Sequence, residues 1–168
     1  MINEGVFFWI ENLALSQAFA ESMLVYPVVL GVHVIALALS VGILALVDLR
    51  LAGVLLKKHE WIDFVQQLRP WFVLAFVLIL ATGVLLFLPM ATHFADSKVF
   101  QVKMLLIVLA GLNALAFEVV SRREQRALQI NADGSATVQP ALSLRVFAVF
   151  SLVLWVSVIA LGRVLAYI

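Results

Sequence analysis

The sequence contains no cysteine among its 168 residues. This absence excludes disulfide bonds, zinc fingers, thiolate-bound iron–sulfur clusters, covalently attached c-type haem and thiol redox chemistry. Charge is also scarce, because 12% of the residues are Asp, Glu, Lys or Arg. The net charge of +1 offers no excess of basic groups, so we expect no nucleic-acid partner. No Lys or Arg precedes Arg50, whereas a cleavable signal peptide has a basic start, so we do not expect one.

Apolar residues dominate what is present. They make up 65% of the chain, and the mean hydropathy is +1.14. A water-soluble globule of this size could not bury so much apolar surface. The composition therefore indicates an integral membrane protein, and we expect one transmembrane domain over residues 1–168.

Long uncharged stretches locate the membrane spans. Residues 22–47 and 70–95 contain no Asp, Glu, Lys or Arg, and about 20 apolar residues suffice to cross a bilayer as a helix. Pro70 suits the first turn of the second helix. We expect four spans, at about residues 24–47, 70–90, 99–120 and 142–166.

Two shorter segments complete the predicted organisation. Apolar residues recur at helical spacing near the start, which predicts an interfacial amphipathic helix at about residues 5–20. Residues 131–140 read as a linker between the third and fourth spans. The predicted fold class is all-α, an integral membrane four-helix bundle preceded by an interfacial helix.

The basic residues are unevenly distributed between the two ends of the predicted bundle. Three of them, Lys98, Lys103 and Arg163, belong to the end that also holds both termini. By the positive-inside rule, the termini face outward. The opposite end carries the remaining basic residues: Arg50, Lys57, Lys58, Arg69, Arg122, Arg123, Arg126 and Arg145.

His33 is the most informative polar residue, because it lies within the first span. A polar side chain near the bilayer centre costs about 2.5–3.5 kcal/mol on insertion scales. One interpretation is an imidazole hydrogen-bonded to a neighbouring helix. The other is an axial ligand to haem iron in the outer half of the bundle.

Three further residues are expected at a depth in the membrane similar to that of His33. Lys103 opens the third span and Arg163 lies near the end of the fourth, so both could neutralise haem propionates or extend to lipid phosphate. His93, at the outer end of the second span, is a candidate second metal ligand, although histidines in such loops are often solvated.

Other polar or aromatic residues have two interpretations each. Asn113, in the middle of the third span, could hydrogen-bond to another helix or border the cofactor. Trp155 could line an apolar haem pocket or pack within the bundle. Asp48 and Arg50 mark the inner end of the first span, where we expect local ion pairs, for instance with Arg122 or Arg123. A proton-relay role for Asp48 is the alternative.

The stretches that carry these residues resemble a known family. They are similar to small bacterial four-helix membrane proteins of the CopD-like superfamily and, more distantly, to HemJ-type protoporphyrinogen oxidase. That resemblance implies a haem b held by the first-span histidine, here His33, with the third-span lysine, here Lys103, nearby. Copper handling is the other activity that it implies. The third-span histidine expected in the oxidase has no counterpart, and Asn113 occupies that region. The matching stretches are 31–53, 69–87, 100–117 and 154–167.

These observations predict a function. We expect a b-type cytochrome of the bacterial inner membrane that transfers electrons, with an oxidoreductase activity left open. Quinone or a membrane redox protein would be the partner, and we expect self-association as a homo-oligomer. Two alternatives remain open: a copper-binding or copper-transporting protein that uses His33 and His93, and a haemless structural subunit of a membrane complex.

Overall fold

The structure is a computed structural model that describes residues 2–56, 61–130, 139–165 and 167, with the backbone alone at 2–4 and 127–130. All regular structure within these ranges is helical. Four helices are long and apolar enough to cross a membrane, which confirms the predicted all-α membrane fold. They are α3 (Val25–Leu51), α4 (Trp61–Phe87), α6 (Lys98–Ile130) and α7 (Leu142–Leu165).

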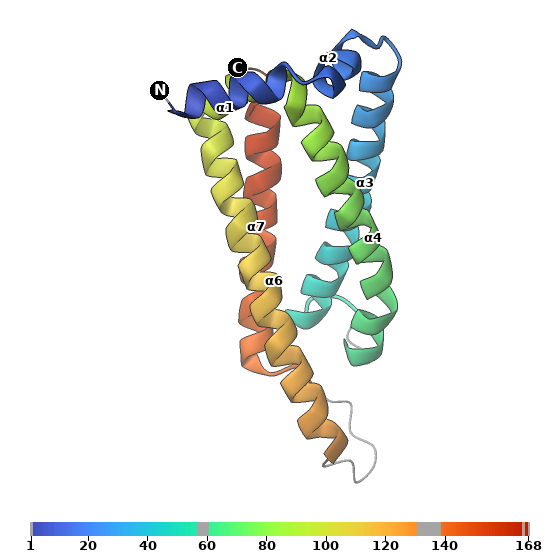
Figure 1. The fold of residues 1–168 in the computed structure, drawn as a ribbon. Coiled ribbons are helices and arrows are strands. Elements are labelled where there is room, and N and C mark those ends of the chain that lie inside the picture. Colours follow the sequence, from blue (N-terminus) through green and yellow to red (C-terminus); the bar gives the residue numbers. More distant parts are fainter. Residues whose placement is uncertain (1, 57–60, 131–138, 166, 168) are drawn as a thin grey trace.

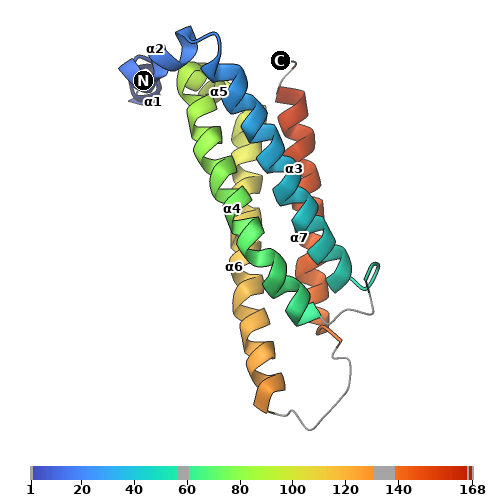
Figure 2. The same ribbon diagram turned by 90° about the vertical axis from the view of Figure 1, so that its right-hand side faces the viewer.

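The four long helices form two antiparallel pairs. Helix α3 packs along α4, and α6 packs along α7 (Figure 1). The pairs are joined through α3 and α7, which lie side by side (Figure 2). Within the described residues α4 and α6 do not pack along each other, so the bundle is closed on its α3–α7 side and open on its α4–α6 side.

Short helices cover one end of the bundle. Helices α1 (Ile2–Glu11) and α2 (Ala14–Glu21) lie across this end, where the N-terminus and the C-terminus also lie (Figure 1). They contact η1 (Leu88–Met90) and α5 (Ala91–Asp96). We call this the capped end. The opposite end, where α3 and α6 finish and α4 and α7 begin, is the basic end.

The predicted interfacial helix is therefore two helices rather than one. The side-chain amide of Asn12 donates a hydrogen bond at 2.8 Å to the Phe8 carbonyl, which also accepts the Asn12 backbone N–H at 3.1 Å. Such side-chain bonds compete with helix continuation. Phe8 and Trp9 on α1, and Leu15 on α2, are each more than 60% exposed, which suits helices that lie at a membrane surface.

Aromatic rings join the short helices to the bundle. Phe87, Phe94 and Phe100 stack pairwise with ring centroids 5.4–6.2 Å apart. Phe7 of α1 meets Phe87 edge-on at 6.3 Å. The cluster thus connects α1, the end of α4, α5 and the start of α6.

Some helix boundaries differ from the predicted spans. Helix α4 begins at Trp61, so Pro70 lies inside it rather than in its first turn. Helix α6 continues past the predicted end to Ile130, because the charged segment after the span is also helical. Residues 131–138 of the predicted linker lie outside the described residues.

Candidate functional site

His33 lies half-buried on α3, where its ring faces α4. Nδ1 of His33 is 2.8 Å from the hydroxyl oxygen of Thr82. That hydroxyl is 2.6 Å from the carbonyl oxygen of Leu78, one turn earlier on α4. A hydroxyl has a single proton, and here it is donated to the helix carbonyl.

This arrangement determines the tautomer of His33. Because the Thr82 proton is directed to Leu78, the Thr82 oxygen must accept a hydrogen bond from Nδ1–H of the imidazole. In the neutral ring, Nε2 then carries the lone pair. The Ile79 backbone of α4 is a further hydrogen-bond partner of the ring. A histidine held through Nδ1–H by a neighbouring helix has the arrangement that metal-bound histidines adopt.

All four long helices contribute residues at the level of His33 along the bundle. A methyl group built on Gly83 of α4 would lie 3.4 Å from Cε1 of His33. A methyl group built on Gly162 of α7 would lie 3.5 Å from Nζ of Lys103, which extends from α6. Lys103 is close enough for its charge to act on the His33 ring. Small residues thus give both polar side chains room between the helices.

Lys103 is half-buried and makes no hydrogen bond or ion pair with another described residue. A cation withdrawn from water without a partner is unfavourable. The ammonium of Lys103 therefore lies near His33 without a compensating charge among the described residues.

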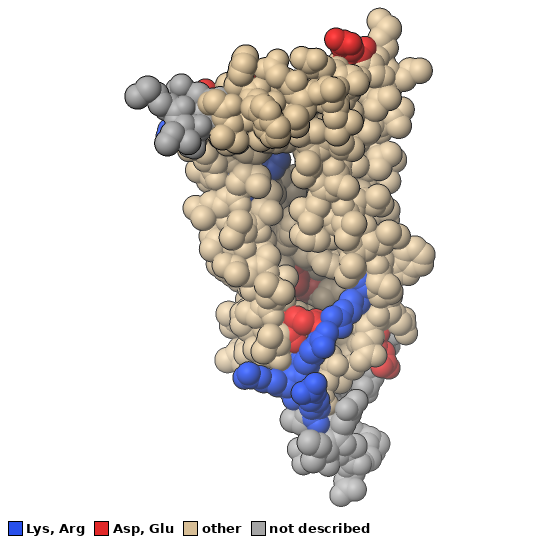
Figure 3. All heavy atoms as spheres, in the orientation of Figure 1, with Lys and Arg blue, Asp and Glu red and all other residues tan. Residues whose placement is uncertain are grey.

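The open side of the bundle is hollowed. Figure 3 shows a depression between the α6–α7 pair and the α3–α4 pair, with a basic group inside its upper part and acidic groups toward its lower part. The depression faces sideways, which in a membrane is toward the lipid.

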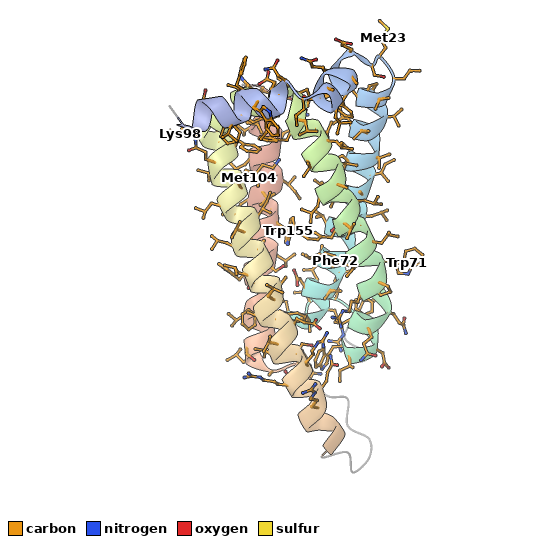
Figure 4. All side chains as sticks on the ribbon, in the orientation of Figure 1. Met23, Trp71, Phe72, Lys98, Met104 and Trp155 are labelled. Atoms are coloured by element: carbon orange, nitrogen blue, oxygen red, sulfur yellow. The ribbon has the colours of Figure 1, made fainter. Side chains whose placement is uncertain are left out.

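An aromatic layer separates the two ends of this space. Trp155 of α7 points into the space between the helix pairs, and Phe72 of α4 lies on the opposite side, whereas Trp71 points outward (Figure 4). Trp155 meets Phe76 edge-on with ring centroids 6.3 Å apart, and Phe76 stacks on Phe72 at 5.9 Å. Trp155 therefore contacts α4 in the middle of the bundle.

Two predicted site residues point elsewhere. Arg163 is exposed, and its guanidinium donates to the Tyr167 hydroxyl and lies 4.8 Å from the centroid of that ring. His93 is exposed on α5, where it lines a surface pocket of about 230 Å³ with Asp96, Ser97 and Leu165. Among the described residues, no three His, Asp or Glu side chains gather closely enough to hold a metal by themselves.

Asn113 makes the interhelical hydrogen bond that is one of its two predicted roles. Its side-chain amide donates to the Phe147 carbonyl of α7 at 3.2 Å, and the residue is buried. Asn113 therefore fastens α6 to α7.

The predicted ion pairing of Asp48 with Arg122 is wrong. Arg122 pairs with Glu118 at 2.5 Å, and Arg69 of α4 pairs with the same carboxylate at 2.6 Å. Glu118 thereby bridges α4 and α6 at the basic end. Asp48 is buried in the bundle, and its Oδ2 atom has no hydrogen-bond partner among the described residues.

Thr82 was not identified from the sequence as the partner of His33. It is the only hydroxyl-bearing residue in the predicted second span, residues 70–90, and a buried imidazole needs a partner on a neighbouring helix. Those two facts would have suggested the pair. No sequence feature indicated the ion pair between Arg69 and Glu118, because several carboxylates were available to the basic residues of that end.

These features define a multi-pass helical membrane protein in which all four long helices contribute to one polar site near the capped end. The chain belongs to the family of unknown function DUF6644, whose match covers residues 7–168. No curated protein and no solved structure matches the chain.

Proposed function

We propose that the protein is a membrane b-type cytochrome that holds haem in the half of the bundle nearer the capped end. The observation that carries the proposal is the position of His33 inside a membrane span, with its ring held through Nδ1 by Thr82. An imidazole in a membrane span that needs no further hydrogen-bond partner for its proton, and keeps a lone pair available, is suited to ligate iron.

The surrounding residues fit such a group. His33 would bind the iron, and Thr82 would orient the ring and stabilise its Nδ1–H tautomer. Lys103 would neutralise a propionate, with Arg163 available at the C-terminal end of α7. Gly83 and Gly162 make room for the His33 and Lys103 side chains themselves, because a methyl group at either position would contact them. A bound haem would supply one-electron redox chemistry.

Residues further along the helices would shield this site. The layer formed by Phe72, Phe76 and Trp155 is an apolar barrier on the side of the basic end. Asn113, which is tied to α7 by its hydrogen bond, would border the site indirectly by fixing the position of α6. Both contributions exclude water, which raises the strength of the electrostatic interactions inside.

The distribution of charge supports a bacterial inner-membrane location with the capped end outside. Eight of the eleven basic residues belong to the basic end, and positive charge favours the cytoplasmic side. The opening between α4 and α6 would admit quinone from the bilayer as a redox partner, or a second copy of the chain in a homo-oligomer.

The test is the absorption spectrum of the purified protein and of two histidine variants. The wild type is expected to show a Soret band that shifts on reduction by dithionite. His33→Ala should lose the haem, whereas His93→Ala is the matched control and should keep it, because His93 is exposed on α5.

Other results would contradict the proposal. Full haem occupancy in His33→Ala would exclude His33 as the ligand. A colourless wild type that stays colourless after incubation with hemin would exclude the haem itself. In that case copper detected by elemental analysis would favour the copper-binding alternative, and metal-free protein would favour a structural subunit.

A further inference from the structure

A second polar site lies toward the basic end, at Asp48. The residue is 6% exposed and lies just before the end of α3. Its Oδ2 atom is fully buried and has no hydrogen-bond partner among the described residues. The site that contains His33 lies about 22 Å away along the axis of the same helix.

The buried core at the end of α3 that carries Asp48 is mainly apolar. It consists of Leu51, Trp61, Leu144 and Ala148, with exposed fractions of 1% or less, and the indole N–H of Trp61 has no described hydrogen-bond partner. Ser151, one turn after Ala148 on α7, lies close enough for its hydroxyl to interact with the Asp48 carboxyl group. Ser151 is itself 8% exposed, so the carboxyl group and the hydroxyl are buried together.

The ion pairs found among the described residues of this end do not include Asp48. On its own helix the nearby charged residue is Arg50, and the packed helices α4 and α7 carry Asp63, Arg69 and Arg145 at the same end. Arg50 has interactions of its own, Asp63, Arg69 and Arg145 form no ion pair with Asp48, and the ion pairs that the described residues make with Glu118 lie at the surface. A buried carboxylate without a counter-ion is strongly unfavourable in an apolar environment.

The negative charge of the buried Asp48 carboxylate can be neutralised by a proton more readily than by a metal ion. Hard cations need about six or more oxygen ligands, whereas the described residues offer the Asp48 carboxyl group and the Ser151 hydroxyl. No group of three acidic or histidine side chains lies there in the part of the chain that the structure describes. Ionisable groups buried in membrane spans commonly bind and release protons.

We propose that Asp48 is a proton-binding site that exchanges with the water at the basic end of the bundle. A proton from water forms an O–H bond at Oδ2, which converts the carboxylate to the neutral acid, and the same proton returns to water on release. Ser151 orients the carboxyl group. The aromatic layer of Phe72, Phe76 and Trp155 separates this site from His33. The inference does not rest on haem binding.

The test is labelling of the purified, detergent-solubilised protein with dicyclohexylcarbodiimide. This apolar reagent adds to protonated carboxyl groups and leaves a stable N-acylurea that peptide mass spectrometry locates. A solvent-exposed aspartate is protonated in about one molecule in a thousand at pH 7. We therefore expect labelling of Asp48 at pH 7, with loss of labelling as the pH rises, and no labelling of the exposed Asp63.

Asp48→Asn is expected to lose the labelled peptide. Ser151→Ala keeps the carboxyl group and is expected to retain the label, which makes it informative even where Asp48→Asn fails to fold. An unlabelled Asp48 at pH 7 in folded wild type and in Ser151→Ala would overturn the proposal, as would equal labelling of Asp48 and Asp63.

An infrared measurement on the wild type tests the exchange with water. The C=O stretching band of a buried protonated carboxyl group is expected to shift when the solvent is changed to deuterium oxide. A band that is absent, or that does not shift over hours, would overturn proton exchange at this site.

Discussion

At the scale of residues, the hydrogen bond between His33 and Thr82 makes Thr82 the most informative position to change. Thr82→Val keeps the shape of the side chain but removes the acceptor of Nδ1–H. A polar group left without its partner costs about 1–3 kcal/mol, so we expect a loss of this size in the free energy of unfolding. Thermal unfolding in detergent micelles would measure it.

The matched control is Thr82→Ser, which keeps the hydroxyl group. It should restore most of the stability, and in the haem-bound protein it should restore the Soret band that Thr82→Val weakens. Equal effects of valine and serine would show that packing of the methyl group, and not the hydrogen bond, is what matters at this position.

Single residues were predictable where few partners existed. His33 stood out because it is a titratable group inside an apolar span, and Asn113 because an amide at that depth needs a carbonyl on another helix. The sequence did not predict where the side chains of Arg163 and His93 point. Both lie near helix ends, where a long or exposed side chain can contact water, lipid or a neighbouring aromatic ring.

At the scale of elements, the aromatic cluster determines how the short helices attach to the bundle. Phe87 takes part in contacts with Phe7, Phe94 and Phe100. Phe87→Ala would remove all three contacts at once. Because Phe87 is half-buried, we expect a cost of about 2 kcal/mol, roughly half of that for a fully buried phenylalanine.

The effect of Phe87→Ala should be local. Amide hydrogen exchange is expected to become faster in α1 and α5 and to remain unchanged in α7, which the cluster does not touch. Trp9→Ala is the control, because Trp9 is 64% exposed and outside the cluster. Uniform acceleration of exchange throughout the bundle would contradict the assignment of the cluster to the attachment of these helices.

The helix boundaries show what periodicity leaves undetermined. Apolar spacing identified the N-terminal segment as helical but did not reveal its break at Asn12 and Leu13. Charge similarly suggested that the third span ends near residue 120, although α6 continues to Ile130. Charged residues end a membrane span without ending a helix.

At the scale of the whole molecule, hydropathy determined the number of long helices but not their arrangement. Twenty or so apolar residues force a helix across a membrane, which is why the four spans could be predicted. The open side between α4 and α6 depends on which faces pack together. Spans that are apolar all round give little indication of this, since lipid and protein accept the same side chains.

The proposed orientation of the molecule can be tested with single cysteines, because the chain has none of its own. Glu21→Cys places a thiol at the capped end and Gln139→Cys places one at the basic end, both at exposed positions. The charge bias predicts that a membrane-impermeant maleimide labels Glu21→Cys in spheroplasts and labels Gln139→Cys only after lysis. The reverse pattern would place the basic end outside. Labelling of both thiols in intact spheroplasts would indicate a mixture of two orientations.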